Sequence, residues 1–195
     1  LAQLGEDVIA LLDHLNIDKA LFCGISMGGL TGLWLARFAP ERFYAVAVAN
    51  TAARIGDQSG WLSRARAVRQ EGMDVVAAGA ADRWFSDAFR QRAPEVVEAL
   101  CHQLTHSDAE GYAACCEALA AADLRGEVGQ IAIPVLIIAG ESDPVTTVVD
   151  ANFLHQQIAT SQVVVLKASH LSNIEAPAAF NAALNGFLLG EQNGR

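Results

Sequence analysis

In the first 50 residues, segments with apolar side chains at helical spacing alternate with short, nearly continuous apolar segments. Residues 3–15 carry apolar side chains at helical spacing, which predicts an amphipathic helix. A short apolar strand is predicted at 19–23. The near-continuous apolar run at 43–50 is typical of a strand buried on both faces. Segment 30–39 between them fits a helix. Helix, strand, helix and strand joined by short loops predict a parallel sheet with right-handed crossovers.

The middle of the chain has a different pattern. From about residue 61 to 124 the sequence is rich in alanine, glutamate and arginine, and it contains no convincing strand. This composition predicts an all-helical cap inserted into the sheet domain, although a run of ordinary crossover helices is the alternative. The predicted helices of this part span residues 62–71, 73–85, 94–105 and 109–122.

The strand pattern returns near the end of the chain. Residues 133–140 form the strongest apolar run, and 162–166 form a shorter one after a helix predicted near 149–158. A last helix is predicted to start at Pro177. The expected fold class is α/β, and we assign three parts: residues 1–56 as the first part of the core, 57–127 as the cap and 128–195 as the second part of the core.

Composition and charge narrow the possible functions. Hydrophobic residues make up 52% of the 195 residues, enough for one compact domain with an inserted subdomain. The formal charge of −9 argues against binding to nucleic acid or to an anionic membrane surface. No apolar run reaches the length of about 18 residues that a membrane-spanning helix needs, and no signal peptide is visible.

The four cysteines show no metal-binding or disulfide spacing. Cys23, Cys101, Cys115 and Cys116 lie in apolar surroundings without a Cys-x-x-Cys pattern. We therefore predict buried free thiols, a reducing cytoplasmic location, and no metal site.

The first apolar run leads into Gly24-Ile25-Ser26-Met27-Gly28, a Gly-x-Ser-x-Gly segment followed by the predicted helix. Strand, turn and helix in this order form a nucleophile elbow, which presents a strained serine above a parallel sheet. We expect Gly24 and Gly28 to supply the space that a strained Ser26 needs. The backbone N–H of Met27, the residue after the serine, would be one oxyanion donor.

A serine nucleophile needs a histidine base and a carboxylate that orients it, and behind such an elbow the chain order is serine, acid, histidine. Asp143 follows the run 133–140 in a Glu-Ser-Asp-Pro turn; a purely turn-forming Asp143 and Glu141 as the acid are the alternatives. His170 lies between the last predicted strand and the last helix, where the base is expected. The sequence therefore predicts a triad of Ser26, Asp143 and His170.

With this triad in place, the sequence resembles the α/β-hydrolase superfamily and, more narrowly, the β-ketoadipate (3-oxoadipate) enol-lactonases. The elbow and segments 140–146 and 169–175 carry the wider likeness, and Asn-Thr-Ala-Ala at 50–53 and Gly-Tyr-Ala-Ala-Cys-Cys at 111–116 carry the narrower one. The resemblance implies an alpha/beta-hydrolase-type parallel sheet with flanking helices and a helical cap. It also implies cofactor-free hydrolysis of a small-molecule lactone, the 3-oxoadipate enol-lactone, in the degradation of aromatic compounds.

The resemblance also suggests roles for cap and loop residues. Trp84 is a candidate for the pocket wall, with simple packing as its alternative. Arg54 or Arg83 could meet the substrate carboxylate, with a solvated surface role as the alternative for each. The cap helices permit self-association into a homo-oligomer without requiring it.

Members of the resembled family carry further N-terminal strands and a second oxyanion donor upstream of the elbow. We therefore expect a truncated chain, in which strand 19–23 is an exposed apolar sheet edge and the isolated segment is weakly active or inactive. Other substrates remain open: a general carboxylesterase, a C–C bond hydrolase or a cofactor-free perhydrolase would use the same triad. A non-catalytic binding protein on this fold is the alternative from a different class.

Overall fold

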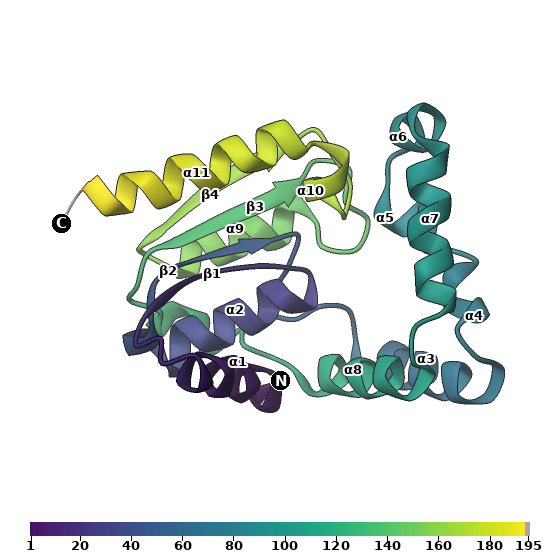
Figure 1. The fold of residues 1–195 in the computed structure, drawn as a ribbon, viewed down its shortest axis with the longest axis horizontal. Coiled ribbons are helices and arrows are strands. Elements are labelled where there is room, and N and C mark those ends of the chain that lie inside the picture. Colours follow the sequence, from purple (N-terminus) through teal and green to yellow (C-terminus); the bar gives the residue numbers. More distant parts are fainter. Residues whose placement is uncertain (194–195) are drawn as a thin grey trace.

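A computed structural model describes the backbone of residues 1–193 and the side chains up to residue 190. Its sheet has four strands in the order β1-β2-β3-β4, and every neighbouring pair is parallel (Figure 1). The predicted α/β architecture is confirmed, with each predicted strand present within two residues of its expected ends. The strands are β1 (Ala20–Ile25), β2 (Phe43–Ala49), β3 (Val135–Gly140) and β4 (Ser161–Leu166).

Helices cover both faces of this sheet (Figure 1). On one face, α2 (Met27–Phe38) packs against β1 and β2, and α9 (Val148–Gln157) packs against β3 and β4; α1 (Ala2–His14) packs against α2. On the other face, α11 (Pro177–Asn193) packs against β2, β3 and β4. No helix of residues 1–193 is long and apolar enough to cross a membrane.

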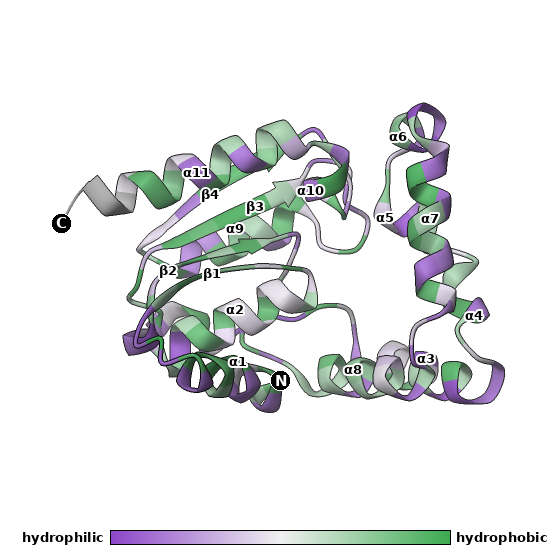
Figure 2. Ribbon diagram, in the orientation of Figure 1, coloured by the Kyte–Doolittle hydropathy of each residue, from purple (hydrophilic) through white to green (hydrophobic). Residues whose placement is uncertain are grey.

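The two central strands are apolar throughout because both of their faces are covered. Val46 and Val48 of β2 belong to the core cluster on the α2 face, and Ala45 and Ala47 belong to the cluster on the α11 face. Strand β3 is likewise hydrophobic along its length in Figure 2 and buried at every residue. Each face of the sheet therefore has its own hydrophobic core.

Strand β1 lies at one edge of the sheet, as the sequence predicts. Its Phe22 packs into the core of the α2 face, but Leu21 remains 37% exposed because α11 covers the other three strands. Cys23 is exposed as well. The prediction of buried cysteines is therefore wrong for Cys23 and holds fully only for Cys116; Cys101 and Cys115 are partly buried.

The segment between β2 and β3 forms the helical cap, and α3 packs along α8 there. The prediction of one helix over residues 73–85 is wrong, because the chain breaks at Gly79 into two short helices. A further helix starts where the Ser86 side chain accepts a hydrogen bond from the backbone N–H of Phe89. The cap helices are α3 (Gln58–Glu71), α4 (Asp74–Ala77), α5 (Ala80–Trp84), α6 (Asp87–Arg92), α7 (Pro94–Thr105) and α8 (Ala109–Ala121).

Three short helical turns complete the described chain, and the sequence pattern did not single them out. Two are 3₁₀ turns, η1 (Pro40–Arg42) and η2 (Val128–Gln130), and α10 (Ser172–Glu175) follows the predicted histidine loop. The proposed division of the chain at 56/57 and 127/128 stays a prediction.

Candidate active site

Ser26 lies in the sharp turn between β1 and α2, in a strained backbone conformation with φ 55° and ψ −118°. Three hydrogen bonds hold this turn. The N–H of Ser26 donates to the carbonyl of Ala49 (2.9 Å), and the Ser26 carbonyl accepts from Thr51 Oγ1 (2.8 Å) and from the N–H of Leu30 (3.0 Å). The strain is therefore supported by the end of the neighbouring strand and by the first turn of α2.

Glycines make this turn possible, though not the pair that the motif suggests. A Cβ at Gly24 would lie 2.2 Å from the carbonyl oxygen of Gly28, and a Cβ at Gly29 would lie 2.8 Å from Thr51 Cβ. A Cβ at Gly28 would meet no atom within 4 Å. The expectation that Gly28 supplies space is therefore wrong, because its missing side chain would point into open space and Gly29 makes the second close approach.

This difference between the glycines gives a stability prediction. Gly24→Ala should destabilise the fold by about 3 kcal/mol or more, since the new methyl group meets backbone that cannot rotate away. Gly28→Ala is the matched control and should change the free energy of unfolding by less than about 1 kcal/mol. Urea unfolding of both variants measures this, and equal midpoints would contradict the glycine assignment.

Ser26, His170 and Asp143 form one hydrogen-bonded chain across three loops. Ser26 Oγ lies 2.9 Å from His170 Nε2, and His170 Nδ1 lies 2.8 Å from Asp143 Oδ2. A carboxylate only accepts, so Nδ1 carries the proton and Nε2 is left to accept from the serine hydroxyl. Glu141, the alternative acid, is exposed. The structure thus brings the three predicted residues together; their catalytic roles stay a prediction.

Asp143 is buried and surrounded by donors. Its Oδ1 accepts from the N–H groups of Val145 (2.8 Å) and Thr146 (3.1 Å), and its Oδ2 accepts from Thr146 Oγ1 (2.8 Å) and Asn50 Nδ2 (3.0 Å) besides His170. Burial opposes ionisation, but hydrogen bonds from His170 and Asn50 and the attraction to His170 outweigh it, so the pKa of Asp143 lies below its ordinary value. The carboxylate is therefore ionised at neutral pH.

Asn50 joins the acid turn to the histidine loop, and sequence reasoning did not assign it a role. It follows β2 with φ 45°, in the left-handed region that asparagine tolerates. Its Nδ2 donates to Asp143 and to the carbonyl of Ser169 (3.1 Å), and its Oδ1 accepts from Ser172 Oγ (2.5 Å). The one available signal was a polar residue at the carboxyl end of a buried strand.

Glu175 links the histidine loop to the cap. Its side chain accepts from the N–H of Ser169 (3.1 Å), from the N–H of Ser86 (3.2 Å) and from the hydroxyl of Ser86. The N–H of Leu171 also donates to the carbonyl of Trp84 (3.0 Å). The residues on either side of His170 are therefore fixed to the cap.

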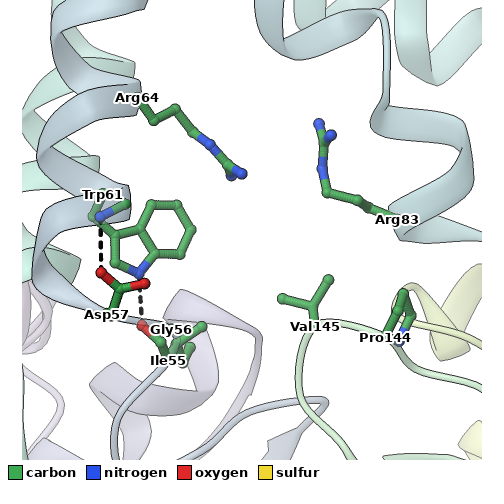
Figure 3. Close-up of a pocket in the computed structure, with 9 residues that line it drawn as sticks. Ile55, Gly56, Asp57, Trp61, Arg64, Arg83, Pro144 and Val145 are labelled. Carbon is green, nitrogen blue, oxygen red and sulfur yellow. Dashed lines mark hydrogen bonds between the residues drawn. The ribbon is translucent and has the colours of Figure 1, made fainter.

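A cavity of about 260 Å³ lies above Ser26, between the sheet domain and the cap. A neighbouring outer cavity of about 290 Å³ shares Trp61, Arg64, Arg83 and Val145 with it (Figure 3). The full lining of the inner cavity is Ser26, Met27, Trp61, Arg64, Val76, Arg83, Trp84, Tyr112, Cys115, Cys116, Leu119, Val145 and His170.

The predicted binding residues separate into two groups. Trp84 and Arg83 line the inner cavity, and so does Met27, whose N–H begins α2 and has no partner within the helix. Arg54 lines neither cavity, because its guanidinium turns to Asp123 at 3.7 Å. Arg64 lines both cavities, although the sequence alone did not single it out.

The chain is similar to several known enzymes. The chain is 58% identical to 3-oxoadipate enol-lactonase 2 of Acinetobacter baylyi over 95% of its length and 70% of that protein. It is 49% identical to 3-oxoadipate enol-lactonase 1 of the same organism, over 96% of the chain and 71% of that protein. The crystal structure of the enol-lactonase from Burkholderia xenovorans LB400 superposes with a TM-score of 0.94 at 45% identity, covering 96% of this chain and 72% of that one.

A family model described as the alpha/beta hydrolase fold matches residues 1–177, which include all three members of the hydrogen-bonded chain. We conclude that this chain belongs to the alpha/beta hydrolase fold family.

Proposed function

We propose that this protein is a carboxylic ester hydrolase that opens the enol-lactone of 3-oxoadipate, a step in the breakdown of aromatic compounds. The observation that carries the proposal is the 58% identity to an enol-lactonase over 95% of the chain. The Ser26–His170–Asp143 arrangement at the inner cavity supplies the chemistry that this reaction needs. The small-molecule lactone is the one partner that the proposal requires.

In the first half of the reaction, Ser26 Oγ attacks the lactone carbonyl carbon and His170 Nε2 takes the hydroxyl proton. Asp143 stabilises the imidazolium, and the N–H of Met27 donates to the oxyanion. The ring C–O bond then breaks, and His170 returns the proton to the departing enol oxygen. The enol stays attached to the acyl group and tautomerises to the 3-oxo form.

In the second half, water is the nucleophile and Ser26 Oγ is the leaving group. His170 removes a proton from the water, whose oxygen bonds to the acyl carbon, and the bond to Ser26 Oγ breaks as Ser26 regains its proton. One water is consumed, and the product carries two carboxylates where the substrate carried one. This cycle uses only side chains and water, so no cofactor enters the proposal.

The loss of enol-lactone absorbance on addition of purified protein tests the proposal directly. A fluorophosphonate probe followed by intact-mass measurement tests the serine separately, because the probe adds mass only to an activated nucleophile. Labelling without lactone turnover would favour one of the other triad hydrolases: an esterase, a C–C hydrolase or a perhydrolase. A folded chain that is neither labelled nor active would favour a non-catalytic protein.

Removing the Asn50 side chain tests whether it positions the acid. Asn50→Ala takes one donor from Asp143 and leaves the Ser169 carbonyl without its amide partner, so the pKa of Asp143 should rise. We expect kcat to fall about 10- to 100-fold with little change in KM. Asn16 also has a positive φ (54°) but lies on the surface, so Asn16→Ala is the control. Equal kcat for the two variants would contradict a positioning role.

We also propose a cytoplasmic location. It is supported by four cysteines that are all free thiols, as a reducing compartment would keep them. Cell fractionation tests this proposal. Recovery of the protein from the medium or the periplasm would contradict it.

A further inference from the structure

Two arginines from different cap helices converge on the space above the catalytic serine. Arg64 projects from α3 and Arg83 from α5, and their side chains extend toward the same open space from opposite sides (Figure 3). Both residues line the inner cavity with Ser26 and also the outer cavity. They therefore stand where the two cavities join.

Each guanidinium is fixed in place by neutral groups. Arg64 stacks over the Trp61 ring, with Cζ 4.8 Å from its centre, and interacts with the Tyr112 hydroxyl. Arg83 Nη2 donates to the carbonyl of Val76 (2.6 Å). These contacts orient two rigid cationic groups without pairing either of them with a carboxylate.

Neither arginine forms an ion pair in the part of the chain that the structure describes. Among the described residues, the arginine ion pairs involve Arg37, Arg42, Arg54, Arg69, Arg90 and Arg125, but neither Arg64 nor Arg83. The described lining of the inner cavity contains no carboxylate. Asp57, in the outer cavity, is engaged as the N-cap of α3 through the N–H of Gly60 (2.9 Å).

Holding two cations together in a partly buried place costs free energy unless an anion joins them. Burial first, and then the charge of Arg64, lower the pKa of Arg83 from its ordinary value, which is the expected sign of mutual repulsion. In a protein of net charge −9, two unpaired arginines at one cavity are not explained by a general excess of positive charge. An anionic ligand group would relieve this repulsion.

We propose that Arg64 and Arg83 form a carboxylate clamp, which makes the site selective for lactones and esters that carry a free carboxylate on the same small molecule. The inference rests on the proposed function for the identity of the natural substrate. In the 3-oxoadipate enol-lactone, one carboxyl group of the diacid is closed into the ring and the other is free. The clamp binds the free carboxylate in the forked geometry that guanidinium favours, while the ring carbonyl faces Ser26.

Two synthetic esters of equal chain length test the clamp independently of the lactone. Mono-p-nitrophenyl glutarate carries a carboxylate, whereas p-nitrophenyl valerate ends in a methyl group. The variants are Arg64→Met and Arg83→Met, which remove the charge, with Arg83→Lys as a charge-conserving variant. Arg66→Met is the matched control, because Arg66 is exposed on the same helix as Arg64. Circular dichroism of every variant checks that it is folded.

For the carboxylate ester we expect kcat/KM to fall about 10- to 100-fold in each Met variant, mainly through KM, and less in Arg83→Lys. For the neutral ester, activity should change less than about threefold, since a rim charge that the substrate does not touch contributes little. Equal losses on both esters would mean that the arginines only hold the cap together, and would overturn the clamp. Unchanged activity on both, or a wild-type preference for the neutral ester, would overturn it too.

If turnover of the synthetic esters is too low to measure, binding of a dicarboxylate tests the clamp instead. Adipate titrated into the Ser26→Ala protein should change the fluorescence of Trp61 and Trp84, which line the cavity, in a saturable way. The Arg83→Met change on this background should abolish the signal, and Arg66→Met should keep it. Absence of adipate binding overturns the clamp. A clamp confirmed by these probes, together with failure to open the enol-lactone, would instead overturn the proposed function alone.

Discussion

Ser26→Ala is expected to reduce kcat for lactone hydrolysis by about 10⁴- to 10⁶-fold. The Ser26 hydroxyl, 2.9 Å from His170 Nε2, is the one nucleophile in the described lining of the inner cavity that is hydrogen-bonded to a base. Alanine removes it, so hydrolysis can no longer proceed through an acyl-enzyme. Binding should survive, because the cavity walls and both arginines are untouched. The measurement is steady-state turnover of the enol-lactone, with fluorophosphonate labelling by intact mass on the same samples.

The control for this variant is Ser63→Ala, which removes an exposed serine hydroxyl from the cap helix α3. Its turnover and labelling should match the wild type. Labelling that persists in Ser26→Ala would mean that another residue carries the activated nucleophile. The elbow would then be a structural turn only.

Asp143→Asn should lower kcat by about 10⁴-fold while leaving the fold intact. Asparagine keeps the shape of the side chain but can present an N–H toward His170 Nδ1. The imidazole would then adopt the other tautomer, with its proton on Nε2, and could no longer accept from Ser26. Turnover at neutral pH measures the loss, and Glu141→Gln, which changes the exposed neighbouring acid, is the control. A greater loss in Glu141→Gln would reverse the assignment of the acid.

We also expect Asp143→Asn to change how the free energy of unfolding depends on pH. The native pKa of Asp143 is below its ordinary value, so the ionised carboxylate contributes stability that is present above the unfolded pKa of about 3.9 and is lost as pH falls through the native value. Asp143→Asn removes this contribution. In urea unfolding from pH 7 to pH 3, the stability difference between wild type and variant should therefore shrink at the acid end. A difference that grows on acidification would contradict the direction of the shift.

Much of the fold could be predicted because the sequence signals of its strands and helices lie within short segments of the chain. Continuous apolar runs reveal strands that helices cover on both faces, and the order of strand, elbow and helix places Ser26 without any distant contact. The prediction of one helix over 73–85 was wrong because single residues decide where the helices end and begin. The break at Gly79 and the new start at Ser86 lie within an otherwise helical composition. The glycine error has a different cause: Gly29 is constrained by Thr51, and the motif contains no information on that neighbour.

The site was predictable only where chain order reveals it. Asp143 and His170 follow from their places after strands, whereas Asn50 meets its partner Asp143 across 93 residues. Glu175 likewise meets Ser86 across 89 residues. Arg64 could not be told from the other arginines of the cap, since only the packing of the cap on the core shows which of them face Ser26.

The hydrogen bonds between Glu175 and Ser86 limit which caps could be exchanged to give this enzyme a new substrate specificity. Two of the three donors to this buried carboxylate come from the cap, and the third comes from the loop that carries His170. A cap transplanted from another hydrolase would therefore have to bring its own donor to this position. Without one, exchanging the cap would leave a buried acceptor unsatisfied beside the loop of His170, so the change meant to alter substrate choice would also disturb the predicted active site. Ser86 and Glu175 should accordingly be inherited or redesigned as a pair.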